Sequence, residues 1–234
     1  MPAHPIEGPL HRVYRAEEHL DDLKARLEIL VVEQQHALGI YFDPNPPHDL
    51  CALTSPIMEA PMRIPVLIGE ICYNLRSAMD NLIFELSRHD CRIEHKRTQF
   101  PIEDYAKVFQ GRCENYLQGI NLAHVAAIEQ LQPYKGCTWS KALRAMSNKD
   151  KHREFVSLRG DFHITGYSKT IDVEYDSLCY PIHRTTHPVH GEMDVKLRVV
   201  AKVMLDDGTP IIQTLEEIKA GVAETLANFQ SAFQ

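Results

Sequence analysis

Hydrophobic residues recur along the first forty residues at the spacing of an amphipathic helix. From His11 onwards the stripe positions are separated alternately by three and four residues, which places them on one face of a helix. The stripe consists of Val13, Ala16, Leu20, Leu23, Leu27, Leu30, Gln34 and Ala37. Such a stripe packs against another helix, in the same chain or in a partner, and we favour packing within the chain.

A second helical pattern covers residues 66–88 and is apolar around about half of its circumference. Its main stripe consists of Leu67, Ile71, Leu75, Ala78, Leu82 and Leu86, and the stripe is widened by Ile68, Cys72, Met79 and Ile83. Because so wide an apolar face needs neighbours on several sides, we predict a central, mostly buried helix. The prolines of residues 41–65 exclude a long helix between the two.

Shorter helices are predicted after a polar, loop-like stretch at residues 89–103. They cover residues 104–118, 121–131 and 138–149. Pro133 ends the second of them, and Thr138 is a suitable N-cap for the third.

The pattern changes to a period of two after Arg153. Residues 155–175 predict two or three strands, and residues 177–193 predict a loop. The alternation over residues 195–205 predicts the clearest strand of the chain.

The last part of the chain combines a turn signal with a helical pattern. Asp207-Gly208 is typical of a hairpin turn, so we expect a return strand from Ile211. Thr214 and Glu217 have the spacing of a capping box and predict the start of a final helix.

Helices therefore precede strands, and the segregation indicates an α+β fold. We predict an N-terminal helical bundle followed by an antiparallel sheet and a C-terminal helix. One domain over residues 1–234 is preferred, with a helical part at about 11–152 and the sheet plus terminal helix at about 153–234. The alternative is a domain boundary near residue 153.

Composition narrows the class of protein. Hydrophobic residues make up 44% and charged residues 24% of the 234 residues, which is typical of a folded globular chain. The net charge of −7 argues against general nucleic-acid binding. The sequence has no charge-free stretch of about 20 residues and no visible signal peptide, so we expect no membrane span. We interpret the six cysteines as reduced thiols in a cytoplasmic protein.

A local basic patch nevertheless occupies residues 141–153 and ends in Asn148-Lys149-Asp150-Lys151-His152-Arg153. Arg153 offers a bidentate fork and Lys151 a point charge for a phosphate or carboxylate, with Asn148 beside them. His152 titrates near neutral pH and is a candidate general acid or base. The structural alternative is that these cations complement the dipole of a helix C-terminus.

The central helix carries a second candidate constellation on its polar face. Glu70, Asn74, Ser77 and Asn81 align along this face. Arg76 and Asp80 have the spacing of an ordinary helical ion pair. If another element covers this face, its polar groups are candidates for holding a ligand, with Asn74 and Asn81 as binding residues. Otherwise the face is solvated.

Metal and cofactor signals are weak. His183, His187 and His190 lie in a predicted loop with Pro188, and His89, Cys91 and His95 form another loose group. Thirteen histidines make such groups expected by chance. No glycine-rich phosphate loop or dinucleotide fingerprint occurs. We therefore predict no metal site and no cofactor.

Five segments resemble a group of uncharacterised bacterial proteins. Residues 68–82 (IGEICYNLRSAMDNL) contain a stretch similar to that group's "hNLRSALDHL" motif, and residues 148–153 (NKDKHR) are similar to its "N-x-DKHR" motif. Residues 98–102 (TQFPI) and 132–134 (QPY) also fit its pattern, as does the Asp207-Gly208 hairpin with its following helix. The resemblance spans most of the chain.

The first motif also resembles, more weakly, the Arg-x4–6-His signature of HEPN domains, many of which are metal-independent ribonucleases with paired motifs at a dimer interface. That resemblance implies that Arg76 and Arg153 hold phosphate and that His152 moves the proton. This chain departs from the signature at the histidine position, which is Asn81. An amide transfers no proton at neutral pH, which argues against catalysis at that position.

Three hypotheses follow, and the sequence leaves open whether the protein is an enzyme. The first is a HEPN-like ribonuclease, or a degenerate relative, that acts at a phosphate site with Arg76 and His152 as catalytic residues. The second is a non-catalytic module that binds a nucleotide, a phosphate or a protein. In the third, both motifs are structural: Asn148 and Asp150 turn the chain, and Arg153 pairs with Glu70 or Asp80. A homodimer through the first or the central helix is compatible with all three.

Overall fold

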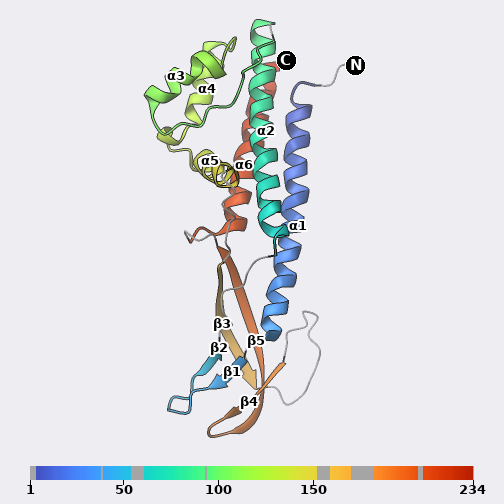
Figure 1. Cartoon of the computed structure of the whole chain (residues 1–234), viewed down its shortest axis with the longest axis vertical. Helices are drawn as coiled ribbons and strands as arrows, with labels where there is room; N and C mark the ends of the chain where they lie inside the picture. The colour runs from blue at the N-terminus through green and yellow to red at the C-terminus, as the bar shows by residue number, and fades with distance from the viewer. Residues whose placement is uncertain are drawn as a thin grey trace. The chain divides into compact units, whose positions relative to one another are not determined.

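The computed structural model has an α+β fold, with helices that precede an antiparallel sheet and a C-terminal helix (Figure 1). The structure describes residues 4–37, 39–53, 61–92, 94–151, 159–169, 182–204 and 208–233. Within these ranges, side chains are not described for residues 31–37, 52–53, 149–151, 159–169, 182–183 and 196–204. The predicted fold class is confirmed.

The described helices are close to the predicted ones. They are α1 (Glu7–Ala37), α2 (Arg63–Cys91), α3 (Ala106–Tyr116), α4 (Leu122–Gln130), α5 (Thr138–Lys151) and α6 (Ile211–Phe229), with short 3-10 turns η1 (Pro133–Lys135) and η2 (Gln230–Phe233). The strands are β1 (Gly39–Phe42), β2 (Leu50–Leu53), β3 (Arg159–Lys169), β4 (Ile182–His187) and β5 (Gly191–Met204).

By its internal contacts, the chain divides into two compact units. One, here the helical unit, comprises Met1–Lys24, Pro61–Val156 and Ile211–Gln234. The other, the sheet unit, comprises Ala25–Ala60 and Ser157–Pro210. The division falls within α1 and differs from a simple boundary near residue 153. A grouping of contacts does not establish whether either unit folds alone, so the single domain stays a prediction.

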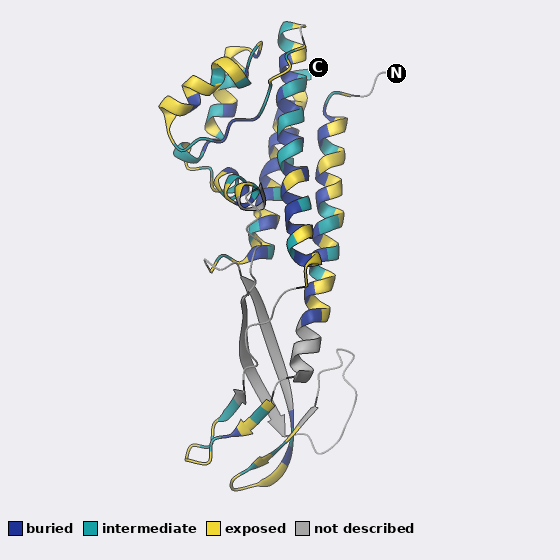
Figure 2. Cartoon of the chain, in the orientation of Figure 1, coloured by how far each residue is buried: buried dark blue, intermediate teal, exposed yellow. Residues whose placement is uncertain are grey.

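α2 is the central helix of the helical unit, as its wide apolar face predicts (Figure 2). All ten positions of that face are buried, and so are the positions of the α1 stripe from Val13 to Leu30. α2 packs against α5 and α6, which also pack against each other. α1 lies beside α2, because Arg12 of α1 donates a hydrogen bond to Asn74 of α2 (3.4 Å). The burial of apolar side chains on several sides of α2 is what holds this unit together.

The sheet unit contains two antiparallel sheets. β3, β5 and β4 form one in that order, and β1 pairs with β2 in a hairpin. β1 also lies against β4, where the Thr185 hydroxyl donates to the Ile40 carbonyl (3.4 Å). Phe42, Met193 and Val195 form the buried cluster, flanked by Ile40 and Leu50.

Several predictions of local structure are wrong. The loop expected at 177–193 contains β4 and the start of β5, and nothing predicted the β1–β2 hairpin. The expected return strand at Ile211 is instead the first turn of α6, so Thr214 lies inside that helix and is not its N-cap. The reason is that Ile211 continues the stripe of Leu215 and Ile218, all of which are fully buried.

The close approach of α5 to α6 depends on Gly221. A Cβ atom at this position would lie 2.4 Å from the indole ring of Trp139. Trp139 in turn stacks on Phe100, with ring centres 6.4 Å apart. The absence of a side chain at Gly221 therefore lets the indole pack directly on the backbone of α6.

We expect Gly221→Ala to lower the free energy of unfolding by about 1–3 kcal/mol, because the indole must move and the packing is lost. The control is Gly111→Ala in α3, where an added Cβ meets nothing within 4 Å. That variant should be neutral or slightly more stable. Urea unfolding measures both, and equal stability of the two variants would show that this packing is not tight.

His187 at the end of β4 supports the turn into β5 with its ring. Its Nδ1 atom accepts hydrogen bonds from the backbone N–H of Val189 (3.1 Å) and of His190 (3.3 Å). Its ring also packs on Phe42 and on His48. Burial lowers the pKa of His187, and the neighbouring His190 and His48 lower it further. The turn therefore requires the neutral ring.

Because the pKa of His187 is lower in the folded chain, the unfolded chain binds more protons, and the stability from His187 is lost as the pH falls below about 6.5. We expect the exchange of the Val189 and His190 amide hydrogens to accelerate in that range, as measured by NMR. His187→Asn should remove the acceleration, since its side-chain oxygen can accept in place of Nδ1. His11→Asn, at an exposed position in α1, should leave it unchanged. An unaltered pH profile in His187→Asn would exclude this role.

Candidate functional site

The 99–103 segment, which precedes α3, has an extended buried stretch that belongs to no sheet. Phe100 and Ile102 are buried, so the backbone polar groups beside them need partners. The Phe100 N–H donates to Asp80 of α2 (2.9 Å), and the Phe100 carbonyl accepts from Arg76 of the same helix. The Ile102 carbonyl accepts from Arg144 of α5 (3.1 Å).

Gln132 completes this pairing from the end of α4. Its side chain is fully buried. Its amide nitrogen donates to the Pro101 carbonyl (2.9 Å), and its amide oxygen accepts from the Glu103 N–H (3.0 Å). Side chains from three parts of the chain therefore replace the strand partner that this segment lacks.

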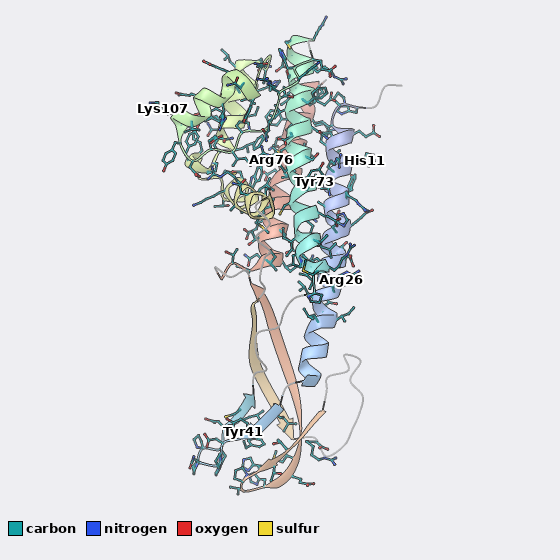
Figure 3. The ribbon with its side chains drawn as sticks, viewed as in Figure 1. His11, Arg26, Tyr41, Tyr73, Arg76 and Lys107 are labelled. Atoms are coloured by element: carbon teal, nitrogen blue, oxygen red, sulfur yellow. The ribbon has the colours of Figure 1, made fainter. Side chains whose placement is uncertain are left out.

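A pocket of about 270 Å³ lies beside this segment, within the helical unit. It is bounded by α2, α3, α5 and the 99–103 segment. Its lining residues are Arg76, Gln99, Phe100, Pro101, Ile102, Glu103, Arg112, Tyr116, Arg144, Ser147 and Asn148. Figure 3 labels Arg76 on α2.

The lining is rich in hydrogen-bond donors. It contains three arginines and a single acid, Glu103. Glu103 pairs with Arg112 (Nε–Oε1, 3.3 Å), Asp80 with Arg76 (3.4 Å), and Asp104 with Arg144. Since a guanidinium has five N–H donors, these pairs and the two carbonyl contacts use only part of the donors. The arrangement suits an acceptor-rich, anionic group.

Two polar atoms in the pocket wall are buried without a hydrogen-bond partner. Among the described side chains, three such atoms occur, namely Glu70 Oε2, Arg76 Nε and Ser147 Oγ. Arg76 and Ser147 both line the pocket, and Arg76 Nε lies 3.4 Å from Asp80 Oδ1, so it has an ion-pair partner without a hydrogen bond. A buried polar atom without a partner costs free energy, so a ligand that reaches the Ser147 hydroxyl gains affinity by supplying one.

The structure brings together two of the predicted site residues, Arg76 and Asn148, in this pocket. Asn74 and Asn81 are not among its lining residues. Asn74 is buried, donates to the Glu70 carbonyl (2.8 Å) and accepts from Arg12 of α1. Asn81 is half-buried. The polar face of α2 is therefore mostly covered and not solvated, with Tyr73 as its exposed position (Figure 3).

The remaining predicted site residues are not placed. Lys151 is the last residue of α5, and its side chain is not described. His152 and Arg153 lie outside the described residues. Proton transfer by His152 and the pairing of Arg153 with Glu70 or Asp80 stay predictions.

Sequence reasoning did not assign Arg112, Tyr116, Arg144 or Ser147 to a site. A local signal exists in α5, where Arg144, Ser147 and Asn148 have the spacing of one helical face. Arg112 and Tyr116 of α3 are likewise four residues apart. No local signal shows that these two faces meet, because α3 and α5 belong to different parts of the chain.

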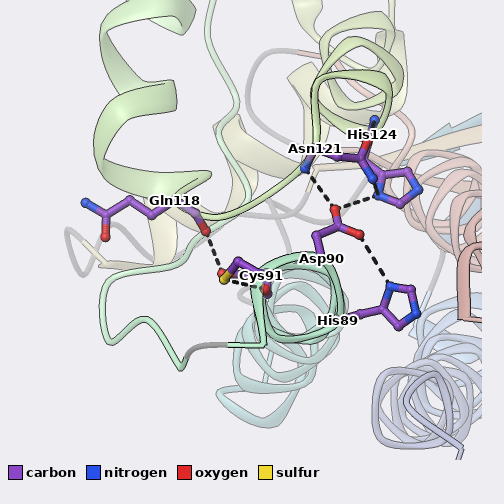
Figure 4. A network of polar contacts seen from close by, with 7 residues as sticks. His89, Asp90, Cys91, Gln118, Asn121 and His124 are labelled. Atoms are coloured by element: carbon purple, nitrogen blue, oxygen red, sulfur yellow. Dashed lines mark hydrogen bonds and ion pairs between the residues drawn. The ribbon is translucent and has the colours of Figure 1, made fainter.

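A separate polar network joins the end of α2 to the start of α4 (Figure 4). Asp90 accepts hydrogen bonds from the Asn121 N–H (2.9 Å), from His124 (2.8 Å) and from His89 (3.3 Å). Burial raises the pKa of Asp90, but the hydrogen bonds from Asn121, His124 and His89 outweigh burial and hold it below its ordinary value. This network ties α4 to α2 and requires an ionised carboxylate.

Both histidine groups contain neighbouring side chains, and the absence of a metal site stays a prediction. In the first group the ring centres of His187 and His190 lie 4.6 Å apart, while the side chain of His183 is not described. Cys91 Sγ lies 3.5 Å from His95 Nε2, and Cys91 also donates to the Ser87 carbonyl. Within the described ranges, no three His, Cys, Asp or Glu side chains are placed to share a metal ion. Among the described residues, none of the five cysteines takes part in a disulfide.

Comparison with protein-family models, with curated proteins and with solved structures found no match to this chain. The resemblances drawn from the motifs therefore stay predictions, as does the homodimer. Among the residues that the structure describes, none of the helices has the length and apolarity that a bilayer crossing requires.

We expect Gln132→Leu to destabilise the chain by about 2–4 kcal/mol, because it leaves the Pro101 carbonyl and the Glu103 N–H without partners. The same change at Gln130, an exposed position at the end of α4, should cost much less. Chemical unfolding of both variants measures the difference. Equal stability would show that the 99–103 segment does not depend on Gln132.

Proposed function

We propose that this chain binds a small phosphate-bearing ligand in the pocket beside the 99–103 segment. The observation that carries the proposal is the pocket lining, which holds three arginines, each paired with one carboxylate. The lining also includes Ser147, whose buried hydroxyl has no hydrogen-bond partner. Guanidinium groups bind phosphate through paired N–H donors, which suits them to this role better than a point charge would.

The side chains of α5 complete the proposed site. Asn148 is exposed and offers an amide to a phosphate oxygen. Ser147 lines the pocket, and its buried hydroxyl has no hydrogen-bond partner. Arg76 and Arg144 hold the 99–103 segment as well, so binding by these residues is preorganised by the contacts that stabilise the fold.

RNA cleavage is the second candidate function, as the HEPN resemblance implies. The observation that favours it is that Arg76 and Asn148 line the same pocket, while His152 follows four residues after Asn148 in the sequence. In this proposal Arg76 and Arg153 hold the phosphate and His152 is the general acid or base. Asn81, in place of histidine, favours binding without cleavage.

Introducing a carboxylate at the pocket tests the proposed site. We expect wild-type chain to bind pyrophosphate, with a change in the fluorescence of Trp139, the single tryptophan. Asn148→Asp should weaken binding about tenfold or more, because it places a negative charge against the ligand. Asn115→Asp, an exposed position in α3 outside the lining, adds the same charge and should have little effect. Glu103→Gln should strengthen binding, since it removes the acid of the lining.

Equal weakening by both aspartate variants would show that net charge alone causes the effect. Wild-type chain that binds no pyrophosphate would refute the site.

Incubation with single-stranded RNA in the presence of a chelator separates the two candidate functions. Products that disappear in His152→Ala would support the ribonuclease, whereas phosphate binding without products would support a binding module.

A further inference from the structure

We propose that the ligand of this pocket is a mononucleotide whose base stacks on Tyr116 and Arg112 while its phosphate lies at Arg76, Ser147 and Asn148. This inference rests on the proposed phosphate binding and adds the class of ligand.

The size of the pocket argues for more than a bare phosphate. Its volume is about 270 Å³, which is many times the ~30 Å³ that one water molecule occupies in the liquid. Pockets for drug-sized ligands begin at about 300 Å³. The space is therefore larger than a bare phosphate needs, and it is small for a dinucleotide cofactor.

The α3 side of the pocket provides a planar surface. The Arg112 guanidinium carbon lies 5.2 Å from the centre of the Tyr116 ring, and Arg112 also donates to the Tyr116 hydroxyl (3.4 Å). Aromatic rings and arginine planes are the two surfaces on which proteins stack nucleobases. Both occur here in the wall of one pocket.

The position of this surface is set by the backbone and not by the tyrosine side chain. The Gln99 N–H donates to the Tyr116 carbonyl (3.2 Å), which fixes the end of α3 to the 99–103 segment. A change of the Tyr116 side chain therefore leaves this link in place. The Tyr116 ring can be removed to test stacking while the phosphate end is kept.

Polar side chains lie near the same surface. The Glu103 carboxylate accepts hydrogen bonds, and the Gln99 amide both donates and accepts. Both residues line the pocket, and the Glu103 side chain is only 18% exposed. Together they present a donor and acceptors with which the polar edge of a base can pair.

The test compares three ligands on the full chain: inorganic phosphate, ribose 5-phosphate and guanosine 5′-monophosphate. We expect the nucleotide to bind about tenfold or more tightly than ribose 5-phosphate, as a stacked base contributes. Tyr116→Leu should abolish this difference and leave the affinity for ribose 5-phosphate unchanged. Tyr116→Phe, which keeps the ring, should retain the difference. Calorimetric titration measures each affinity.

The outcomes separate this inference from the proposed function. If ribose 5-phosphate and the nucleotide bind equally, or if Tyr116→Leu keeps the preference, base stacking is refuted and phosphate binding stands. If none of the three ligands binds, both proposals fail. An RNA oligomer that binds far more tightly than the mononucleotide would overturn the assignment of a single nucleotide as the ligand.

Discussion

The arrangement of the helical unit depends on one constraint. The buried, extended 99–103 segment must find hydrogen-bond partners for its backbone N–H and carbonyl groups. The 99–103 segment has no strand partner, and an unpaired buried carbonyl or N–H would cost about as much as a lost hydrogen bond. Four side chains form the required hydrogen bonds, namely those of Arg76 and Asp80 of α2, Gln132 after α4 and Arg144 of α5. Each contact also holds in place the helix that carries or precedes the side chain. This one segment therefore sets the arrangement of α2, α4 and α5.

This constraint gives the conspicuous polar residues of α2 a structural role. Three of the segments that carry the motif resemblance meet here, since Arg76 and Asp80, the 98–102 segment and Gln132 contact one another. Another begins with Asn148, which lines the adjoining pocket. These contacts give the motif residues a packing role. The proposed ligand site lies beside them, where the arginines that pair the segment have further N–H donors.

In the proposed site, stability and binding share residues. Arg76 and Arg144 serve both, and Arg112 also holds the segment through its ion pair with Glu103, whereas Ser147 and Asn148 line the pocket. Their substitution separates binding from folding, which substitution of Arg76 does not. In the sheet unit, the neutral His187 ring stabilises the structure in two ways, because it packs on Phe42 and accepts hydrogen bonds from the turn.

The sequence by itself determined the elements whose signal is local. The stripes of α1, α2 and α6 were visible because burial recurs with the helical period, and the strand at 195–205 because it recurs with period two. β4 and the β1–β2 hairpin were missed, since His183, Thr185 and the prolines after Phe42 give no apolar alternation. Only the tertiary structure brought Arg112, Arg76 and Arg144 to one pocket. Their meeting depends on long-range contacts with the 99–103 segment. No periodic pattern along the chain shows which distant side chains form hydrogen bonds with a buried backbone.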